Sequence, residues 1–270
     1  MPDLLIHSMA EFSDIIFPAL EIAQAKNLVE VGAEYGTMTL NLIEFTKQKG
    51  GELVSIDPCP SPEAEELFHS TEHARLVVDL SLNVLDRYDA DAYLIDGDHN
   101  YYTVFHELEL SWKKSRGAGR PYLAFLHDVG WPCARRDQYC NPDQIPEEYR
   151  HAHSWDKGIT LDNPDLIDGG FRGEGGWAAA LKEGGPQNGV LTAIEDFAQD
   201  KDEQLFWARI PAVFGLGVLF DRNAPWTEEM VALLGPLNDH PLLATLERNR
   251  LQCYLRVIEM QDAMSEQNEV

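Results

Sequence analysis

The sequence predicts an α/β protein built on a doubly wound, seven-stranded, mostly parallel sheet, with helices on both faces and a C-terminal antiparallel hairpin. Five short apolar runs alternate with stretches of helical periodicity, which is the pattern of parallel strands joined by crossover helices. Two further apolar runs are separated only by a tight turn, which indicates a hairpin. With 270 residues, 44% of them hydrophobic, the chain can bury this core as a single domain over 1–270.

The first half of the chain supplies the parallel part of the sheet. Apolar residues recur at helical spacing over 8–25, where Pro18 is expected to kink or divide the helix. The predicted parallel strands are short apolar runs, over 27–32, 52–56, 75–78, 92–95 and 122–126. The helices between them are predicted over 37–45, 83–88 and 104–112, and in the last of these Glu107 is placed away from the apolar face.

The second half begins with a long irregular segment. Residues 130–189 are rich in glycine, proline and aromatic residues, and so long a segment within a domain is typical of a lid or substrate-binding insertion. A helix over 190–197 and strands over 206–210 and 213–220 follow it. The C-terminal extension, 226–264, contains two predicted helices, 226–234 and 241–260. An amphipathic tail of this kind packs on its own domain or on a second copy, so a homodimer through the N- or C-terminal helices is a candidate assembly.

Polar side chains follow each of the five parallel strands. They are Glu30 and Gly32, Asp57, Asp79, Asp96 with Asp98, and His127 with Asp128. Since the carboxyl ends of parallel strands meet at one edge of a sheet, these side chains are expected to converge on one rim. Asp-Gly is also a common turn dipeptide, so Asp96-Gly97-Asp98-His99 taken alone fits a plain acidic turn as well.

The charge of the chain excludes some classes of partner. The sequence has 46 Asp and Glu against 21 Lys and Arg, a formal net charge of −25. Such a surface repels nucleic acid and anionic membrane, so neither is expected as a partner. The four cysteines form no Cys-x-x-Cys pair, and neither a signal peptide nor an apolar run of membrane-spanning length is seen. We therefore expect a cytoplasmic protein with free thiols.

A glycine turn after the first strand indicates a nucleoside site. The pattern Glu30-x-Gly32-x-x-x-Gly36 lets a ligand approach the backbone where no Cβ intrudes, and the following helix start offers unpaired N–H groups. Asp57, about 20 residues further on, is placed where an acid binds ribose hydroxyls. The pattern lacks the central glycine of the dinucleotide fingerprint, which favours a nucleoside without a pyrophosphate.

Together, the strand order, this turn, the acid after the second strand and the closing hairpin resemble the class I S-adenosylmethionine-dependent methyltransferases, whose sheet is Rossmann-like. The likeness covers roughly residues 28–221. It implies that Glu30 and Gly32 lie against the methionine half of S-adenosylmethionine, and Gly36 is a further cofactor-binding candidate. It further implies that Asp57 binds the ribose, and that Asp79 and Leu80 meet the adenine.

More narrowly, Leu94-Ile95-Asp96-Gly97-Asp98-His99-x-Tyr101 with His127-Asp128 resembles the metal-dependent O-methyltransferases grouped with macrocin O-methyltransferase and related antibiotic-tailoring enzymes. This likeness implies that Asp96 and Asp128 bind a divalent metal and that Asp98 is the catalytic base. His127 stands where those enzymes place a carboxylate, and imidazole suits Mn²⁺ or another transition metal better than Mg²⁺. His99 is a further candidate, either as a ligand or as a base.

The predicted function is therefore methyl transfer from S-adenosylmethionine to a hydroxyl of a small molecule, such as a sugar or a glycosylated natural product, with the help of a divalent metal. Two alternatives stay open. Sequences with a similar Ile-Asp-Gly-Asp-His run are also labelled cephalosporin hydroxylase-like, and an iron-dependent hydroxylase would use two histidines and one carboxylate. The other alternative is a nucleoside-binding module without catalysis.

Overall fold

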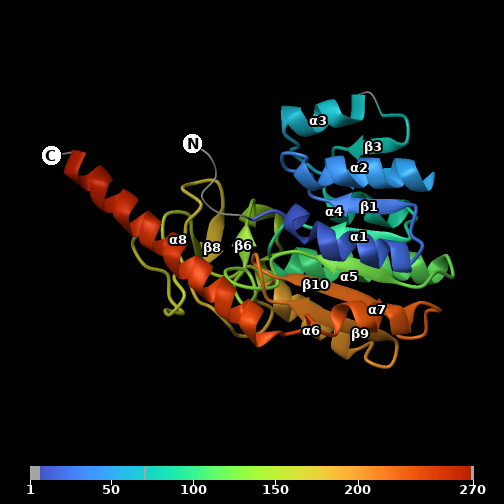
Figure 1. Cartoon of the computed structure of the whole chain (residues 1–270). Coiled ribbons are helices and arrows are strands. Elements are labelled where there is room, and N and C mark those ends of the chain that lie inside the picture. Colours follow the sequence, from blue (N-terminus) through green and yellow to red (C-terminus); the bar gives the residue numbers. More distant parts are fainter. Residues whose placement is uncertain (1–6, 70, 269–270) are drawn as a thin grey trace.

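The computed structural model describes residues 7–69 and 71–268, and a seven-stranded sheet forms its centre (Figure 1). The strand order is β3-β2-β1-β4-β5-β10-β9. The first five strands are parallel, and β10 lies antiparallel between β5 and β9. The strands are β1 (Leu28–Val31), β2 (Leu53–Ile56), β3 (Ala74–Val77), β4 (Ala92–Ile95), β5 (Leu123–Leu126), β9 (Leu205–Ile210) and β10 (Leu216–Asp221). The predicted Rossmann-like fold is confirmed.

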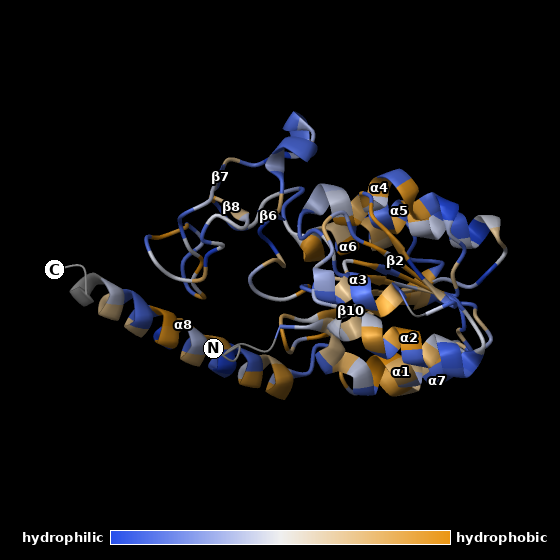
Figure 2. Cartoon of the chain, turned by 90° about the horizontal axis from the view of Figure 1, so that it is seen from above, coloured by the Kyte–Doolittle hydropathy of each residue, from blue (hydrophilic) through white to orange (hydrophobic). Residues whose placement is uncertain are grey.

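Helices cover both faces of this sheet, as Figure 2 shows from above. One face is covered by α1 (Ser13–Ile22), α2 (Thr37–Lys49) and α7 (Thr227–Leu234), and the other by α4 (Ser81–Val84), α5 (Tyr101–Gly117) and α6 (Val190–Gln199). Helix α3 (Pro62–His69) lies beside β3. Because the central strands are buried on both faces, they are continuously apolar rather than alternating.

Several helices of the structure begin or end at other residues than predicted. The expected 8–25 helix begins as a 3₁₀ turn, Met9–Phe12, capped by the Ser8 hydroxyl, and continues as α1, which Pro18 does not divide. In place of 83–88 there is α4 followed by a 3₁₀ turn, Leu85–Arg87. Helix α5 is longer than predicted at both ends. At its N-terminal end, Asn100 caps the first turn by accepting from the Thr103 N–H at 2.9 Å.

The predicted strand 213–220 begins three residues late, at Leu216. Val213, Phe214 and Gly215 have φ angles of +49°, +64° and +91°, so they form the turn of the hairpin and cannot pair as a strand. The Phe214 carbonyl accepts a hydrogen bond from the Gly130 N–H. The turn is therefore tied to the segment that follows β5.

The insertion after β5 contains a small antiparallel sheet of order β6-β8-β7. Its strands are β6 (Gln138–Tyr139), β7 (His153–Ser154) and β8 (Ala178–Ala180), and two 3₁₀ turns lie at Pro142–Gln144 and Glu147–Tyr149. The fully buried Arg136 guanidinium donates to the carbonyls of Ala180 and Pro164, which fastens the segment together. That this insertion is a lid stays a prediction.

Helix α8 (Pro241–Asn268) leads away from the main sheet beside the insertion, and it is longer than the predicted 241–260 (Figure 1). Arg172 of the insertion forms a two-pronged ion pair with Asp262 of α8, at 2.7 and 3.1 Å. In the part of the chain that the structure describes, no helix combines the length and the apolar character needed to cross a membrane.

Candidate active site

Four of the predicted site residues meet at the carboxyl ends of β4 and β5. Asp96 and His99 follow β4, and His127 and Asp128 follow β5, the next strand in the sheet. The strand pairing continues to this point, since the His127 N–H donates to the Ile95 carbonyl at 3.1 Å. Adjacent parallel strands of equal length therefore bring the two motifs to one rim.

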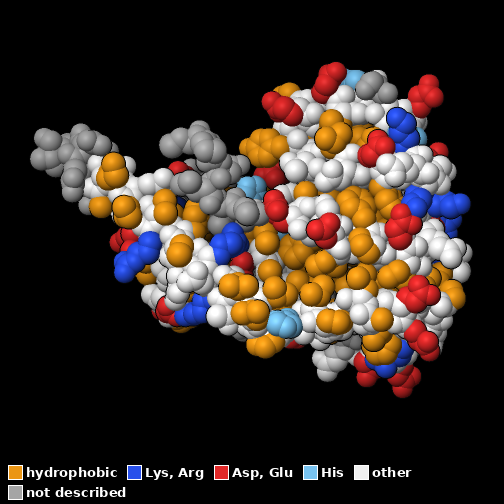
Figure 3. Space-filling model, in the orientation of Figure 1, with side chains coloured by type: hydrophobic (Ala, Val, Ile, Leu, Met, Phe, Trp, Pro, Cys, Tyr) orange, Lys and Arg blue, Asp and Glu red, His pale blue; other side chains and the backbone are white. Residues whose placement is uncertain are grey.

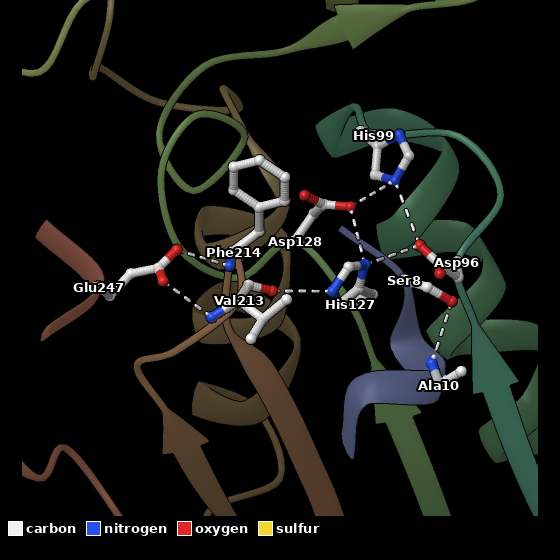
Figure 4. A network of polar contacts seen from close by, with 9 residues as sticks. All are labelled: Ser8, Ala10, Asp96, His99, His127, Asp128, Val213, Phe214 and Glu247. Atoms are coloured by element: carbon white, nitrogen blue, oxygen red, sulfur yellow. Dashed lines mark hydrogen bonds and ion pairs between the residues drawn. The ribbon is translucent and has the colours of Figure 1, made fainter. Parts of the chain in front are cut away.

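The side chains of these four residues point toward one another (Figure 4). His99 Nε2 lies 2.8 Å from Asp128 Oδ2 and 3.4 Å from Asp96 Oδ1. His127 Nδ1 lies 3.2 Å from each of the same two oxygens. The carboxylates of Asp96 and Asp128 are thus shared by two imidazole rings, one on either side.

A backbone carbonyl fixes the orientation of the His127 ring. Its Nε2 lies 3.0 Å from the Val213 carbonyl oxygen, which only accepts, so Nε2 carries the hydrogen. In the neutral ring the lone pair is then on Nδ1, which faces Asp96 and Asp128. The ring is 1% exposed and packs edge-on against Phe12, so it is held from several directions. A histidine ligand whose other nitrogen donates to a carbonyl is the usual arrangement at metal sites.

The charges of the four side chains are strongly coupled. Burial by itself lowers the pKa of His99 and His127, but the carboxylates of Asp96 and Asp128 raise both pKa values well above the ordinary one. Burial opposes ionisation of the two acids as well, yet the imidazoles hold the pKa of Asp96 and that of Asp128 below the usual range. Asp128 is buried and Asp96 is half-buried, so two carboxylates this close together need positive charge between or beside them, from protons or from a metal ion.

The donor set fits a divalent metal. Asp96, His99 and Asp128 each offer a ligand atom, and these atoms lie within 4.8 Å of one another. At metal–ligand distances of about 2.1 Å, neighbouring ligand atoms are roughly 3 Å apart, close to the contacts seen here. His127 Nδ1 faces the same oxygens. Two imidazoles with two carboxylates suit Mn²⁺, Fe²⁺ or Zn²⁺ better than Mg²⁺, which prefers oxygen ligands.

Asp98 makes a different set of contacts. Its oxygens accept hydrogen bonds from the His99 N–H at 3.1 Å, from the Asn100 side-chain amide and from the Thr103 hydroxyl at 3.1 Å. Asp98 therefore binds the N-terminal end of α5. Burial raises its pKa above the ordinary value for Asp, which makes it a stronger base than an exposed carboxylate.

The two acids nearest the glycine turn, Glu30 and Asp57, both accept hydrogen bonds from groups of the protein. Glu30 is buried in β1, where it accepts from the hydroxyls of Thr39 at 2.8 Å and Ser55 at 2.6 Å, and burial raises its pKa to about 7. Asp57 accepts from the backbone N–H groups of Ala33 at 2.8 Å and Glu34 at 3.1 Å. Asp57 thus fixes the conformation of the turn itself.

Packing and backbone conformation within the protein explain why the turn has glycine at positions 32 and 36. A Cβ on Gly32 would lie 2.1 Å from the Asp96 carbonyl oxygen, so the end of β1 and the end of β4 pack together only without a side chain. Gly36 has a φ of +81° and precedes α2 as its N-cap. The close backbone approach that the sequence predicts is made here by Asp96, and contact of either glycine with a cofactor stays a prediction.

Asp79 and Leu80 lie at the start of α4, at the end of β3. The exposed Asp79 carboxylate accepts from the Leu80 N–H at 2.7 Å and from the Asn83 side chain at 2.8 Å, and these two hydrogen bonds lower its pKa. Next to them, the Ser81 hydroxyl donates to Glu107, a buried acid of α5. This acid is a residue that sequence reasoning misplaced.

Glu107 was predicted to lie off the apolar face of its helix, but it is fully buried. The reason is that α5 packs against both the sheet and α6, so its buried stripe is wider than the apolar residues alone indicate. Buried positions recur at helical spacing, at 104, 107, 108, 111, 112 and 115. That spacing is the signal that would have found Glu107.

Comparison with known proteins adds the class of the domain. Residues 29–128 match the model of a family described as a methyltransferase domain. The match covers less than half of the chain. The matched stretch contains β1 from Val29 on, β2 to β5 and every predicted site residue, and the prediction of a methyltransferase is confirmed. The narrower likeness to the macrocin O-methyltransferase group stays a prediction.

Solved structures similar to this chain are methyltransferases of low sequence identity. The O-methyltransferase TomG of Streptomyces achromogenes is 14% identical over 82% of this chain and 83% of that chain, with a TM-score of 0.48. The methyltransferase PaMTH1 of Podospora anserina is 15% identical over 80% of each chain, with a TM-score of 0.47. An O-methyltransferase of Bacillus cereus is 13% identical over 82% and 84%, with a TM-score of 0.45. No curated protein matches the sequence.

Proposed function

We propose that this chain transfers the methyl group of S-adenosylmethionine to a hydroxyl of a small molecule, such as a sugar or a glycosylated natural product, with a divalent metal. The observation that carries the proposal is the convergence of Asp96, His99, His127 and Asp128 at the carboxyl ends of β4 and β5 within a methyltransferase domain. A donor set of this kind favours a site for metal-assisted chemistry over the alternative interpretation, a plain acidic turn.

In this proposal the cofactor lies along the ends of β1 to β3. Glu30, Gly32 and Gly36 would border the methionine part, Asp57 the ribose, and Asp79 with Leu80 the adenine. S-adenosylmethionine carries a positive sulfonium, which an acidic rim attracts, and the net charge of −25 acts in the same direction. The acceptor would enter beside the insertion 130–189, whose position next to the rim suits a lid.

Asp96, His127 and Asp128 would hold the metal, with His99 as a fourth ligand. Such a metal, when bound, supplies a positive charge that lowers the pKa of a nearby hydroxyl. The proton of that hydroxyl needs an acceptor, and Asp98 is our candidate base because burial raises its pKa. His99 serves as base only if it does not ligate, since both roles use Nε2.

A binding experiment tests the proposal without knowledge of the acceptor. Calorimetry with S-adenosylhomocysteine, with and without Mn²⁺ or Mg²⁺, should give clear binding of the nucleoside, and Mn²⁺ should bind more tightly than Mg²⁺ because two ligands are imidazoles. Absence of heat with S-adenosylhomocysteine under every metal condition would contradict the cofactor assignment. Candidate hydroxyl compounds can then be screened for a mass gain of one methyl group.

Two matched variants separate the roles of the neighbouring residues Asp98 and His99. His99→Asn should weaken Mn²⁺ binding by about tenfold or more, because it removes a ligand. Asp98→Asn should leave Mn²⁺ and S-adenosylhomocysteine binding unchanged and lower the rate of methyl transfer by about 10²- to 10⁴-fold, as expected for a lost base. Normal turnover by Asp98→Asn would remove its catalytic role, and unchanged Mn²⁺ affinity in His99→Asn would remove His99 from the ligand set.

The two imidazoles favour one second candidate, the iron-dependent hydroxylase. His99, His127 and either Asp96 or Asp128 make up the two-histidine, one-carboxylate set of such enzymes. Oxygen uptake by the Fe²⁺-loaded protein would support this alternative. The same measurement with S-adenosylmethionine present distinguishes the two activities, because methyl transfer consumes no oxygen.

We also propose a homodimer through the terminal helices. Three large side chains on α7 and the start of α8 are exposed, Val231 by 45%, Leu242 by 58% and Leu246 by 57%. A second copy of this chain would cover them.

A further inference from the structure

We infer that Glu247 of α8 is a positioning residue for the metal centre, because it holds the turn whose carbonyl orients His127. The inference rests on the metal site proposed above. It concerns a residue more than one hundred positions away from the site in the sequence, on a helix outside the matched methyltransferase domain.

Both carboxylate oxygens of Glu247 accept hydrogen bonds from the turn at Val213 and Phe214 (Figure 4). Oε2 accepts from the Val213 N–H at 3.1 Å, and Oε1 accepts from the Phe214 N–H at 2.9 Å. Arg250, one helical turn on, donates to the same two oxygens at 2.7 and 2.6 Å. The carboxylate side chain is 13% exposed, so these charge-assisted contacts are largely shielded from water.

The turn needs these hydrogen bonds because its backbone is strained. Val213 and Phe214 both have left-handed φ angles, +49° and +64°, although neither is glycine. A branched residue such as valine is disfavoured there, and this conformation persists only where its surroundings enforce it. Two consecutive N–H groups directed at one carboxylate provide that enforcement. The guanidinium of Arg250 also lies 5.0 Å from the centre of the Phe214 ring.

The same turn determines which nitrogen of His127 faces the site. The Val213 carbonyl accepts from Nε2, and this leaves Nδ1 directed at Asp96 and Asp128. If the turn relaxed to an ordinary φ, the carbonyl would move and the ring would lose the contact that fixes its tautomer. Outer contacts of this kind change metal affinity by about 10- to 100-fold. The contact chain therefore runs from Glu247 to the turn, to His127 and to the metal.

Cobalt titration of the full chain tests the inference, because the visible absorption of bound Co²⁺ reports ligand geometry without activity. Glu247→Gln should bind Co²⁺ about tenfold or more weakly and shift the absorption. Glu259→Gln is the matched control, since it removes the same charge from the same helix at an exposed ion pair with Arg256. Its titration should match that of the original protein. Near-ultraviolet circular dichroism checks that each variant is folded.

A double variant distinguishes positioning from a general effect on folding. In a His127→Ala background, Glu247→Gln should cause little further loss of Co²⁺ affinity, because the two act through one contact chain. An equal further loss there, or a Glu247→Gln titration like that of Glu259→Gln, would overturn the inference.

Should Glu247→Gln not fold, Arg250→Gln keeps the carboxylate and should give a smaller loss of affinity, whereas no change would overturn the inference. Absence of Co²⁺ binding by the original protein would contradict the metal site itself.

Discussion

The buried acid Glu107 makes the stability of the fold depend on pH. Its Oε1 accepts from Ser81, at the start of α4, and its Oε2 has no hydrogen-bond partner among residues 7–69 and 71–268. Burial raises its pKa from 4.5 to about 8, so the side chain is neutral at pH 7. The unfolded chain releases this proton near pH 4.5, whereas the folded chain keeps it until about pH 8.

A pH series therefore tests Glu107. Its contribution to stability is fully present below about pH 4.5 and is lost as the pH rises toward 8, because the folded state binds more protons in this window. The shift corresponds to roughly 5 kcal/mol. Glu107→Gln keeps the acceptor for Ser81 and removes the titration, so it should lose less stability than the original protein between pH 5 and 8. Urea unfolding at both pH values measures this, and parallel pH profiles would contradict it.

At the scale of elements, Asp137 connects the insertion to two helices. One oxygen accepts from the Tyr101 N–H at 2.8 Å, at the start of α5, and from the Gly189 N–H at 2.6 Å, just before α6. The other oxygen accepts from the Tyr139 hydroxyl at 2.9 Å. These contacts satisfy N–H groups that helix starts leave unpaired. They also fix where the insertion begins relative to the site.

Substitution of Asp137 should show this connection. Asp137→Ala leaves two buried N–H groups without an acceptor and should lower the free energy of unfolding by about 3 kcal/mol. Asp137→Asn keeps one oxygen for both groups and avoids a buried charge, whose cost is visible in a pKa that burial raises to about 6. It should therefore cost less than about 1 kcal/mol. Urea unfolding measures both losses. Equal losses in the two variants would show that the N–H contacts are not the source of the stabilisation by Asp137.

The whole molecule presents two contrasting surfaces. Figure 3 shows hydrophobic side chains gathered over α1 and α7 and along α8, with acidic groups toward the top and lower edges of the sheet domain. A net charge of −25 disfavours association of two copies, so a dimer needs an apolar contact large enough to overcome that repulsion. The exposed side chains of Leu242 and Leu246 mark where such a contact would be centred.

Light scattering tests the proposed dimer. The original protein should show twice the mass of the chain, and a Leu242→Gln, Leu246→Gln double variant should move toward the mass of one chain. Met260→Gln and Met264→Gln, at the far end of the same helix and equally exposed, serve as the control and should leave the mass unchanged. A single-chain mass for the original protein at all salt concentrations would refute the proposal.

Elements of this fold could be predicted from the sequence because strands buried on both faces must be apolar, and because they end where polar residues reach the rim. That argument located β1 to β5 and placed Asp96 and Asp128 at the same edge. It could not determine which polar side chains turn toward one another. The strand argument does not distinguish Asp96 from Asp98, two residues on, and only the resemblance gave them different roles. In the structure one faces the imidazoles and the other binds the start of α5.

Tertiary structure alone decided the contacts between distant segments. His99 ends beside Asp128 because β4 and β5 are neighbours, and His127 is oriented by a turn 86 residues later in the chain. That turn was predicted as strand, since its residues are apolar and nothing local indicates that Glu247 holds it in a left-handed conformation. The strands of the sheet and the polar residue types at its rim could be predicted from the sequence. Packing decided the geometry, because hydrogen bonds between segments far apart in the chain leave no periodic pattern in the sequence.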